Sequence, residues 1–337
     1  MSGPHYNIPV FIPGLACPFY CVFCNQQSIT GKCKAPDEIA VKHIIDTHLS
    51  TLTPGEGTIE VAFFGGSFTA LDMEVQNRYL EMVKPYLEKG AVSGIRISTR
   101  PDFITHGILI NLRSRGVVAI ELGAQSLDDE VLEKSGRGHT VQQVETAAGL
   151  IYDHGFELGL QMMTGLPGDN EQKSLNTAQK IIQLNAATTR IYPTLVIRNT
   201  PLEKLYARGA YFPQSLEEAV NLCAKLYELF QANKVKVLRT GLHPSEGMLN
   251  GESLVAGPFH PAFGELVMSK IWQNRLISKT RDISHYPLTI YVHPSDLNAA
   301  IGHKASNRKI LEKEFGKIYF KSDITIKKGA LYVDHAR

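Results

Sequence analysis

Short apolar runs and amphipathic stretches alternate along most of this chain, with turns between them. Six apolar runs predict strands, at residues 6–13, 58–64, 94–99, 117–125, 156–163 and 188–197. Stretches with a helical period follow them, near residues 37–50, 72–89, 103–115, 128–135 with 140–154, 171–185 and 215–232. Glycines stand where three of these helices would end, at Gly90, Gly116 and Gly155. This order predicts an α/β fold, a partial (β/α)6 barrel of parallel strands with its chemistry at their C-terminal ends.

The pattern changes after the last of these helices. Residues 236–285 are rich in glycine and proline, and we expect them to form an extension that covers a barrel made of residues 1–235. Residues 286–337 predict a separate small α/β module, in which one strand, two helices joined by a tight turn and two further strands follow one another.

Composition places the chain among ordinary globular proteins. Of its 337 residues, 43% are hydrophobic and 20% are charged. The first residues have no basic-then-apolar signal, and no run of about 18 apolar residues occurs, so we expect no membrane association and a cytoplasmic location. Five cysteines, with three crowded together, do not resemble a disulfide framework. Cys223 is expected in the core and Cys33 in a loop.

The net charge of +2 hides an asymmetry along the chain. Residues 270–337 contain 13 Lys and Arg against 6 Asp and Glu, a difference of +7, while the remainder has 22 against 27, a difference of −5. A basic C-terminal part on a mildly acidic body indicates a surface that meets phosphate. A merely solvated basic surface explains the charge equally well.

Three cysteines, Cys17, Cys21 and Cys24, lie within eight residues, just after the first predicted strand. Zinc sites close their tetrahedron with a fourth Cys or His, whereas thiolates hold iron–sulfur clusters. A CxxxCxxC loop supplies three ligands to a [4Fe–4S] cluster and leaves one iron open to a small molecule. A zinc loop or a chance cluster of thiols is the alternative. With Phe23 before the last cysteine, this segment resembles the signature of the radical S-adenosylmethionine (SAM) superfamily.

A glycine turn, Gly65-Gly66-Ser67, follows the second predicted strand and should lie on the same rim as the cysteines. Its exposed backbone groups could bind the amino-acid end of a ligand, although such a turn often only reverses the chain. Five further motifs follow in order, at residues 98–102, 121–126, 136–140, 165–168 and 192–200. Together they resemble the radical-SAM part of the Elongator catalytic subunit family, which modifies tRNA wobble uridine, over roughly residues 6–260. Oxygen-independent coproporphyrinogen oxidases share several of these motifs, but the blocks at 136–140 and 192–200 favour the Elongator-like branch.

The resemblance implies two cofactors, a [4Fe–4S] cluster ligated by Cys17, Cys21 and Cys24, and SAM. It also implies SAM contacts at eight positions: Phe23 beside the adenine, Gly65, Gly66 and Ser67 at the methionine end, Ser98 and Gln125 near the ribose, Arg137 at the carboxylate, and Gln161 where some relatives have an acid. Relatives often carry Glu at the position of Ser98. The Elongator family also spaces its first two cysteines farther apart, whereas this chain has the common compact spacing. Two of these roles have alternatives: Gln125 could be a satisfied core amide, and Arg137 could be a surface cation.

The C-terminal module resembles a KH-type nucleic-acid domain around Ile301-Gly302-His303-Lys304-Ala305. In that family a GxxG turn and a helix N-terminus meet phosphates. Here Ala305 replaces the second glycine. The predicted phosphate contacts are Lys304, Arg308 and Lys309, and the alternative is a basic domain that only packs.

These features predict a radical SAM enzyme whose 5′-deoxyadenosyl radical acts on an RNA base, in tRNA, with an electron donor of the flavodoxin or ferredoxin type. Candidates on the substrate side are Tyr192, Arg198 and His139. An enzyme acting on a small metabolite or peptide, and a non-catalytic RNA-binding protein, are the alternatives. The Elongator family also has an acetyltransferase-like domain; because the sequence stops at Arg337, we expect that domain to be absent, and the resemblance then does not imply carboxymethylation of uridine.

Overall fold

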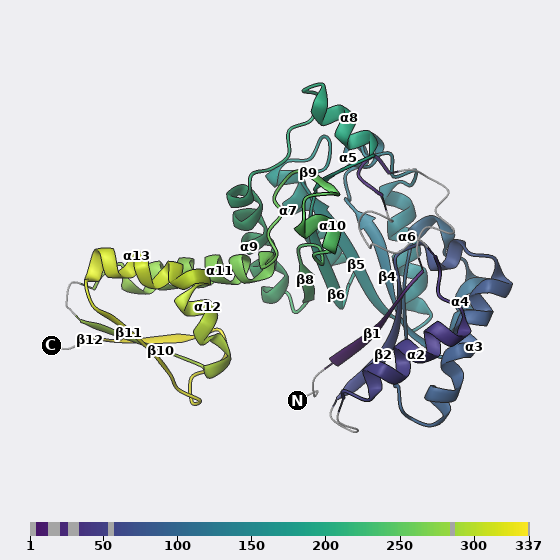
Figure 1. The fold of residues 1–337 in the computed structure, drawn as a ribbon, viewed down its shortest axis with the longest axis horizontal. Coiled ribbons are helices and arrows are strands. Elements are labelled where there is room, and N and C mark those ends of the chain that lie inside the picture. Colours follow the sequence, from purple (N-terminus) through teal and green to yellow (C-terminus); the bar gives the residue numbers. More distant parts are fainter. Residues whose placement is uncertain (1–4, 13–20, 26–33, 53–56, 284–286, 336–337) are drawn as a thin grey trace. The chain divides into compact units, whose positions relative to one another are not determined.

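The computed structural model describes residues 5–12, 21–25, 34–52, 57–283 and 287–335. The chain divides into two compact units (Figure 1). Unit 1 comprises residues 1–214 and 230–258, and unit 2 comprises residues 215–229 and 259–337. Cys17 and Cys33 lie outside the described residues. Among the described residues, none of the helices combines the length and the apolar character needed to span a membrane.

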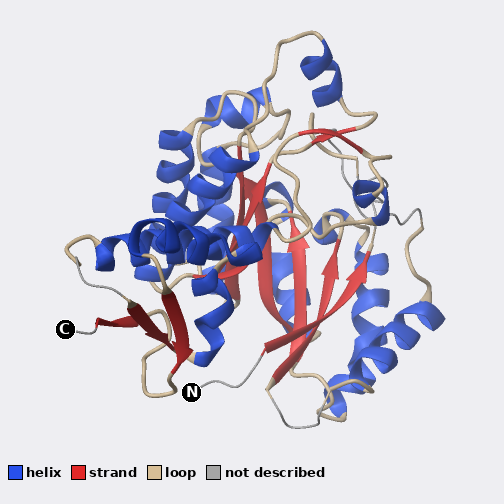
Figure 2. Cartoon of the chain, turned by 60° about the vertical axis from the view of Figure 1, so that its left-hand side comes forward, coloured by secondary structure: helices blue, strands red, loops and turns tan. Residues whose placement is uncertain are grey.

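Unit 1 is built on a seven-stranded sheet in the order β1-β2-β3-β4-β5-β6-β8. Its strands are β1 (His5–Phe11), β2 (Thr58–Phe64), β3 (Gly94–Thr99), β4 (Val117–Gln125), β5 (Glu157–Thr164), β6 (Thr188–Pro193) and β8 (Lys236–Thr240). Every neighbouring pair is parallel. Figure 2 shows these strands side by side in a curved sheet. The predicted partial barrel of alternating strands and helices is confirmed.

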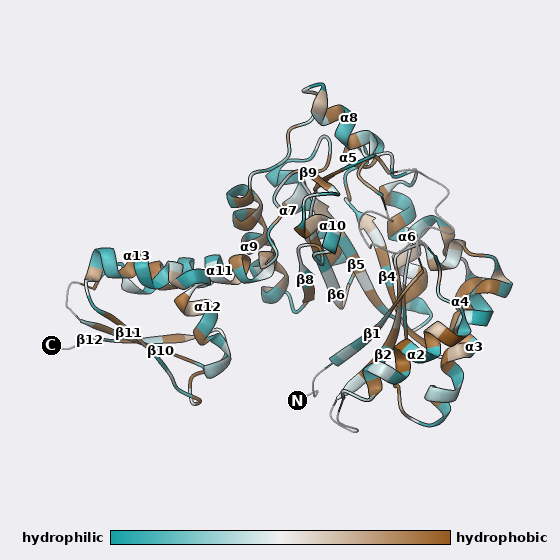
Figure 3. Ribbon diagram, in the orientation of Figure 1, coloured by the Kyte–Doolittle hydropathy of each residue, from teal (hydrophilic) through white to brown (hydrophobic). Residues whose placement is uncertain are grey.

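Helices connect successive strands of this sheet. They are α2 (Glu38–Leu49), α3 (Met73–Glu88), α4 (His106–Ser114), α5 (Asp129–Lys134), α6 (Val141–Asp153) and α7 (Glu171–Gln183). Side chains of Asp37, Thr105, Asp128, Thr140 and Asn170 each accept a hydrogen bond from a backbone N–H in the first turn of the helix that follows. These helices carry both apolar and polar stretches, which Figure 3 shows as brown and teal ribbon. Their apolar sides pack on the sheet, because a helix that connects parallel strands must cover a face of it.

The two faces of the sheet differ in chemistry. On β2, Val61 and Phe63 are at most 1% exposed, and on β4 Ile120 and Leu122 are fully buried. The residues that alternate with them are polar or small: Glu60 on β2, Arg96 and Ser98 on β3, Glu121 and Gly123 on β4, Gln161 on β5 and Arg190 on β6. Because successive side chains of a strand point to opposite faces, this second set lines the concave side of the sheet. The strand pattern therefore places charge inside the barrel.

The segment predicted as a glycine- and proline-rich extension contains regular structure. It supplies β8, the seventh strand, as well as the short helix α10 (Glu246–Leu249), the strand β9 (Leu254–Ala256) and the long helix α11 (Phe263–Thr280). The predicted strand 188–197 is broken after Pro193, and β7 (Val196–Ile197) instead pairs antiparallel with β9. Thr194 still donates its N–H to the carbonyl of Thr164 at 2.9 Å, so the pairing with β5 ends just after Pro193. The helix α8 (Pro201–Ala207) follows β7.

Unit 2 contains most of α9 (Leu216–Ala232), α11 and a small α/β module. The module consists of β10 (Leu288–Val292), α12 (Leu297–Ile301), α13 (Ser306–Phe315), β11 (Ile318–Ser322) and β12 (Leu331–His335), the order that the sequence predicted. Its sheet has the order β11-β10-β12, with β10 parallel to β11 and antiparallel to β12. Trp272 of α11, Leu311 of α13 and Ile290 of β10 share its core. Cys223 is fully buried in α9, as predicted.

Candidate functional site

The second half of the cysteine loop is held by backbone contacts to distant segments of unit 1. The N–H of Cys24 donates to the carbonyl of Cys21 at 3.1 Å, which makes a tight turn. Val22 donates its N–H to Ser135 at 3.1 Å, and its carbonyl accepts from Leu202 at 2.8 Å. Through Arg137, which donates both to Cys21 Sγ and to the carbonyl of Gly123, the Cys21 thiol is linked to the C-terminal part of β4.

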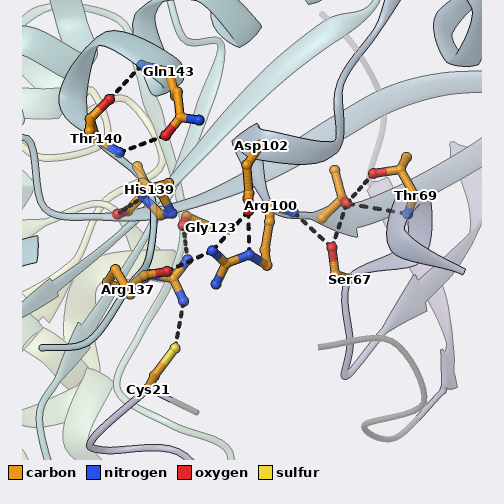
Figure 4. A network of polar contacts seen from close by, with 12 residues as sticks. Cys21, Ser67, Thr69, Arg100, Asp102, Gly123, Arg137, His139, Thr140 and Gln143 are labelled. Atoms are coloured by element: carbon orange, nitrogen blue, oxygen red, sulfur yellow. Dashed lines mark hydrogen bonds and ion pairs between the residues drawn. The ribbon is translucent and has the colours of Figure 1, made fainter. Parts of the chain in front are cut away.

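Arg137 lies directly beside Cys21. Its Nη1 donates to Cys21 Sγ at 3.1 Å and its Nη2 to the carbonyl of Gly123 at 2.5 Å (Figure 4). The side chain is buried, at 6% exposed, and its Nε has no partner among the described residues. Arg137 is therefore not a surface cation, and the alternative to its predicted role is wrong. A guanidinium at this distance suits a thiolate ligand.

A second buried arginine supports the first. Arg100 Nη2 donates to the carbonyl of Arg137 at 2.6 Å, while its Nε and Nη2 donate to the two carboxylate oxygens of Asp102 at 2.9 and 3.1 Å. The N–H of Arg100 donates to Ser67 Oγ at 3.2 Å, and Ser67 Oγ shares a hydrogen bond with Thr99 Oγ1 at 3.0 Å. The glycine turn, the end of β3 and the Arg137 backbone thus form one connected network (Figure 4).

The glycine turn itself is constrained by close packing. Gly65 has φ +100°, and a Cβ added there would lie 3.3 Å from the carbonyl oxygen of Ile12. Ile12 directly precedes the cysteine loop in the sequence, so the turn and the loop share a rim, as predicted. Gly66 and Ser67 border a small hollow lined also by Phe64. Ser67 is 2% exposed and its hydroxyl is bonded internally, so the half-buried backbone of Gly65 and Gly66 is the part of the turn that can meet a ligand.

Gln125 ends β4 in a conformation that few residues adopt, with φ +67°. A Cβ added at Gly123 would lie 2.9 Å from Gln125 Nε2 and 3.5 Å from Arg137 Nη2, so Gly123 leaves room for both side chains. Gln125 Oε1 is buried and without a partner among the described residues. A satisfied core amide would have its oxygen bonded, so that alternative is wrong. The Gln125 amide and the Arg137 guanidinium both border Gly123, and the amide oxygen is left as an acceptor.

Ser98 and Gln161 are brought together on the concave face. Gln161 Nε2 donates to Ser98 Oγ at 3.3 Å and to Glu121 Oε2 at 3.0 Å. Glu121, at 1% exposed, also accepts from Arg190 Nε at 2.7 Å and Nη2 at 3.1 Å. Because a carboxylate only accepts, it fixes which end of the Gln161 amide faces it.

Sequence reasoning missed the charged residues of this interior. Arg96 is fully buried; it donates to Glu60 and Glu157, both at 2.8 Å, and its Nη1 lies 3.6 Å from Glu121. Burial disfavours its charge, but the three carboxylates outweigh burial and raise the pKa of Arg96. The signal was present, because charges at every second position of an apolar strand indicate a polar inner face.

The three substrate candidates lie in different surroundings. Tyr192 is half-buried on β6, where burial raises the pKa of its hydroxyl beside Arg190. Arg198 is exposed after β7; its Nε donates to the carbonyl of Glu252 at 2.9 Å. His139 is 5% exposed beside Arg137, and its Nε2 contacts the carbonyl of Ala124 at 3.3 Å. Their roles toward a substrate stay predictions.

Burial, and then the charges of Arg137 and Arg100, lower the pKa of His139 to about 3. The imidazole is therefore neutral near pH 7. Since Nε2 faces a carbonyl oxygen, it carries the proton, and Nδ1 is left as a buried acceptor without a partner among the described residues.

Phe23 packs beside a small apolar cluster of Val196, Leu202 and Tyr211, and its predicted contact with adenine likewise stays a prediction.

The predicted phosphate contacts of unit 2 surround a turn with three left-handed residues. Gly302 has φ +85°, Lys304 +52° and Ala305 +58°. Ala305 thus adopts a left-handed conformation that glycine takes more readily, in spite of its Cβ. Lys304 and Lys309 are exposed, whereas Arg308 is half-buried with its guanidinium 5.6 Å from the centre of the Phe320 ring.

Comparison with known proteins agrees with the geometry of unit 1. A family model described as "Radical SAM superfamily" matches residues 11–181, and one described as "Radical_SAM C-terminal domain" matches residues 186–273. The chain is 30% identical to Elongator complex protein 3 of Dictyostelium discoideum over 249 residues, which are 62% of this chain and 44% of that protein. It is 28% identical to a tRNA uridine(34) acetyltransferase of Methanocaldococcus jannaschii over 184 residues, 49% of this chain and 34% of that enzyme.

A solved structure of Methanocaldococcus infernus Elp3, lacking its N-terminus, superposes with a TM-score of 0.63 at 22% identity. The match covers 83% of this chain and 64% of that one, and it shows a shared fold. The chain spans between about a third and half of the length of the curated relatives named above.

Proposed function

The chain belongs to the radical SAM superfamily, and on that basis we propose that it is a cytoplasmic enzyme that cleaves SAM reductively and modifies a base of tRNA. Cys17, Cys21 and Cys24 would hold a [4Fe–4S] cluster. When bound, the cluster would pass an electron from a flavodoxin- or ferredoxin-type donor to SAM, giving methionine and a 5′-deoxyadenosyl radical that takes a hydrogen atom from the base.

One observation carries this proposal: two buried polar atoms without a partner belong to side chains that both border Gly123, and one of these side chains, Arg137, contacts Cys21. Arg137 Nε is a buried donor and Gln125 Oε1 a buried acceptor, each without a partner among the described residues. Leaving such groups unpaired costs about 1–3 kcal/mol each, so the site is built for a ligand that bonds both. A ligand with a carboxylate and an N–H or O–H group, such as the amino-acid end or the ribose of SAM, fits them.

Surrounding residues hold Arg137 and Gln161 in place. Arg100 fixes the Arg137 backbone through its bond to the carbonyl and is itself fixed by Asp102. Glu121 orients the Gln161 amide beside Ser98, which leaves the Ser98 hydroxyl proton free to donate to a sugar oxygen. Ser98 would then take the ribose contact for which relatives often use Glu.

The substrate class is supported by the relatives and by charge. The similar proteins named above are a tRNA uridine(34) acetyltransferase and an Elongator protein. The +7 balance of residues 270–337 and the exposed Lys304 and Lys309 suit a polyanion. An uncharged metabolite or peptide would not require this charge.

The test begins with anoxically purified protein supplied with iron and sulfide, SAM and dithionite. We expect 5′-deoxyadenosine, and its absence would favour a binding protein without this reaction. Replacing Arg137 by Gln should weaken SAM binding by about tenfold or more, because a charge-assisted bond is lost. Because Arg137 also donates to Cys21 Sγ, the affinities are compared at equal iron content. Arg78→Gln, on the exposed side of α3, is the matched control. Mass spectrometry of tRNA nucleosides from cells with and without the gene then identifies the substrate base, and unchanged nucleosides would point to a metabolite or peptide.

A further inference from the structure

One face of the small sheet in unit 2 is aromatic and open to solvent. Along β10, Leu288, Ile290 and Val292 are fully buried against the helices, so Thr289 and Tyr291 point to the opposite face. The core on the buried side includes residues of α11 and α13. The basic turn that precedes α13 therefore belongs to the helical side of the module, and the face with Tyr291 is a different surface.

Each of the two flanking strands adds a tyrosine to this face. Tyr332 of β12 pairs with Tyr291, and their ring centroids are 6.1 Å apart. Tyr319 of β11 pairs with Thr289. Tyr332 is 60% exposed and Tyr319 40%. We call Tyr291, Tyr319 and Tyr332 the tyrosine face; every strand of the sheet contributes one ring.

Two lysines accompany these rings. Lys321, which pairs with Tyr291 across the sheet, has its Nζ 5.7 Å from the centre of that ring. Lys317 Nζ lies 5.2 Å from the centre of the Tyr319 ring. Lys327 and Lys328 follow in the turn that leads to β12. An acid, Asp334, also stands on this face, opposite Thr289, so the local charge is positive but not uniformly so.

Exposed aromatic rings bordered by ammonium groups match single-stranded nucleic acid. Bases stack on the rings, every base offers a flat face for this, and the cations meet the phosphates. A duplex hides its base faces, and an apolar protein partner would not need the lysines. We propose that the tyrosine face binds a single-stranded stretch of RNA, with bases stacked on the tyrosines and phosphates against Lys317 and Lys321. This inference rests on the proposed RNA substrate and adds a contact surface separate from the basic turn.

The test measures binding of a short, fluorescein-labelled single-stranded RNA of mixed sequence to the full chain by fluorescence anisotropy. The double variant Tyr319→Ala, Tyr332→Ala should bind about tenfold more weakly or worse, because each lost stack removes a substantial part of the affinity. The double Phe variant at the same positions keeps the rings and should bind within about twofold of the unchanged chain. Tyr152→Ala is the matched control, because Tyr152 is also 60% exposed but lies on α6 in unit 1.

A second variant, Lys317→Gln with Lys321→Gln, leaves all three rings in place and tests the same face if the alanine variant does not fold. It should reduce the slope of log affinity against log salt by about 1.4, since each of the two phosphate contacts on a single strand contributes about 0.7 through counterion release. The inference is overturned if neither variant changes RNA binding, if the Phe variant is as weak as the Ala variant, or if a blunt RNA duplex binds as tightly as the single strand. Sedimentation velocity measures whether the chain associates with itself. If the variants lose self-association but keep their RNA affinity, the tyrosine face binds a second copy of the chain and the inference is overturned.

The 5′-deoxyadenosine assay, run on the same preparation of the chain without substitutions, separates the proposed function from this inference. Cleavage of SAM without RNA binding at this face rejects the inference alone. RNA binding that depends on the tyrosines, without cleavage of SAM, rejects the radical chemistry and supports this face.

Discussion

Replacing Glu121 by alanine should destabilise unit 1 more than the same change at any exposed acid of the barrel. Glu121 is 1% exposed and accepts two hydrogen bonds from Arg190 and one from Gln161. The Arg190 side chain is itself only 13% exposed. Removal of the carboxylate would therefore leave a guanidinium in the interior with its charge uncompensated. Breaking a buried pair in this way costs about 3–5 kcal/mol.

That loss is large against the whole stability of a domain, which is about 5–15 kcal/mol. Glu157 is the matched control, because it belongs to the same network but is 42% exposed. Because solvent screens its bond to Arg96, Glu157→Ala should lower the free energy of unfolding by about 1 kcal/mol or less. Arg96 would keep Glu60 in that variant, at 2.8 Å. Glu121→Gln keeps one acceptor oxygen but no charge, and should fall between the two.

Urea unfolding followed by circular dichroism measures these differences in anoxic, cluster-free protein. Hydrogen exchange with mass spectrometry then assigns them, since peptides of β4 and β6 should lose protection in Glu121→Ala while peptides of unit 2 should not. Trp272, the chain's only tryptophan, lies in unit 2 and reports that unit separately by fluorescence. Equal effects of the Glu121 and Glu157 variants would refute the reasoning, because they would mean that the barrel interior screens charge as well as its surface does.

Four further predictions concern other parts of the chain. Alanine in place of Cys21 or Cys24 should lower bound iron after anoxic reconstitution to the background level, and zinc bound to the unchanged protein would contradict the cluster assignment. Because the pKa of His139 is about 3 when folded and about 6.5 when unfolded, only the unfolded chain binds this proton between these values. The contribution of neutral His139 to the free energy of unfolding is therefore complete above about pH 6.5 and is lost as the pH falls toward 3. His139→Gln should flatten the pH dependence of the urea midpoint. Lys304→Glu with Lys309→Glu, which leaves the packed Arg308 untouched, should weaken RNA binding and its salt dependence in anisotropy titrations. Ala305→Gly should stabilise unit 2 by about 1 kcal/mol in Trp272 fluorescence, because Ala305 has φ +58°; no gain would mean that the turn relaxes in solution.

The order of the elements could be predicted from the sequence because it depends on local periods. Six of the seven strands and the helices between them follow from alternation and helical spacing. β8 was missed, since a strand of five residues beside a glycine-rich segment has little pattern of its own. It is stabilised by parallel pairing with β6, a contact that no local window contains.

The candidate site, too, could be predicted from the sequence only where it depends on local spacing and chain order. Spacing alone identified the cysteine loop, the glycine turn and their common rim, because chain order decides which loops follow parallel strands at the same edge. The neighbours of these residues could not be read in this way. Arg137 reaches Cys21 across 116 residues of sequence, and Arg190 reaches Glu121 across 69.

The sequence by itself determined that this chain alternates strands and helices and carries three thiols in a radical SAM spacing. Only the tertiary structure decided that Arg137 is buried beside a thiol, that Gln125 presents an unpaired oxygen, and that Glu121 and Arg190 form a pair within the barrel. The physical reason is that periodicity and ligand spacing are local, whereas burial and charge pairing depend on which distant strands lie next to each other.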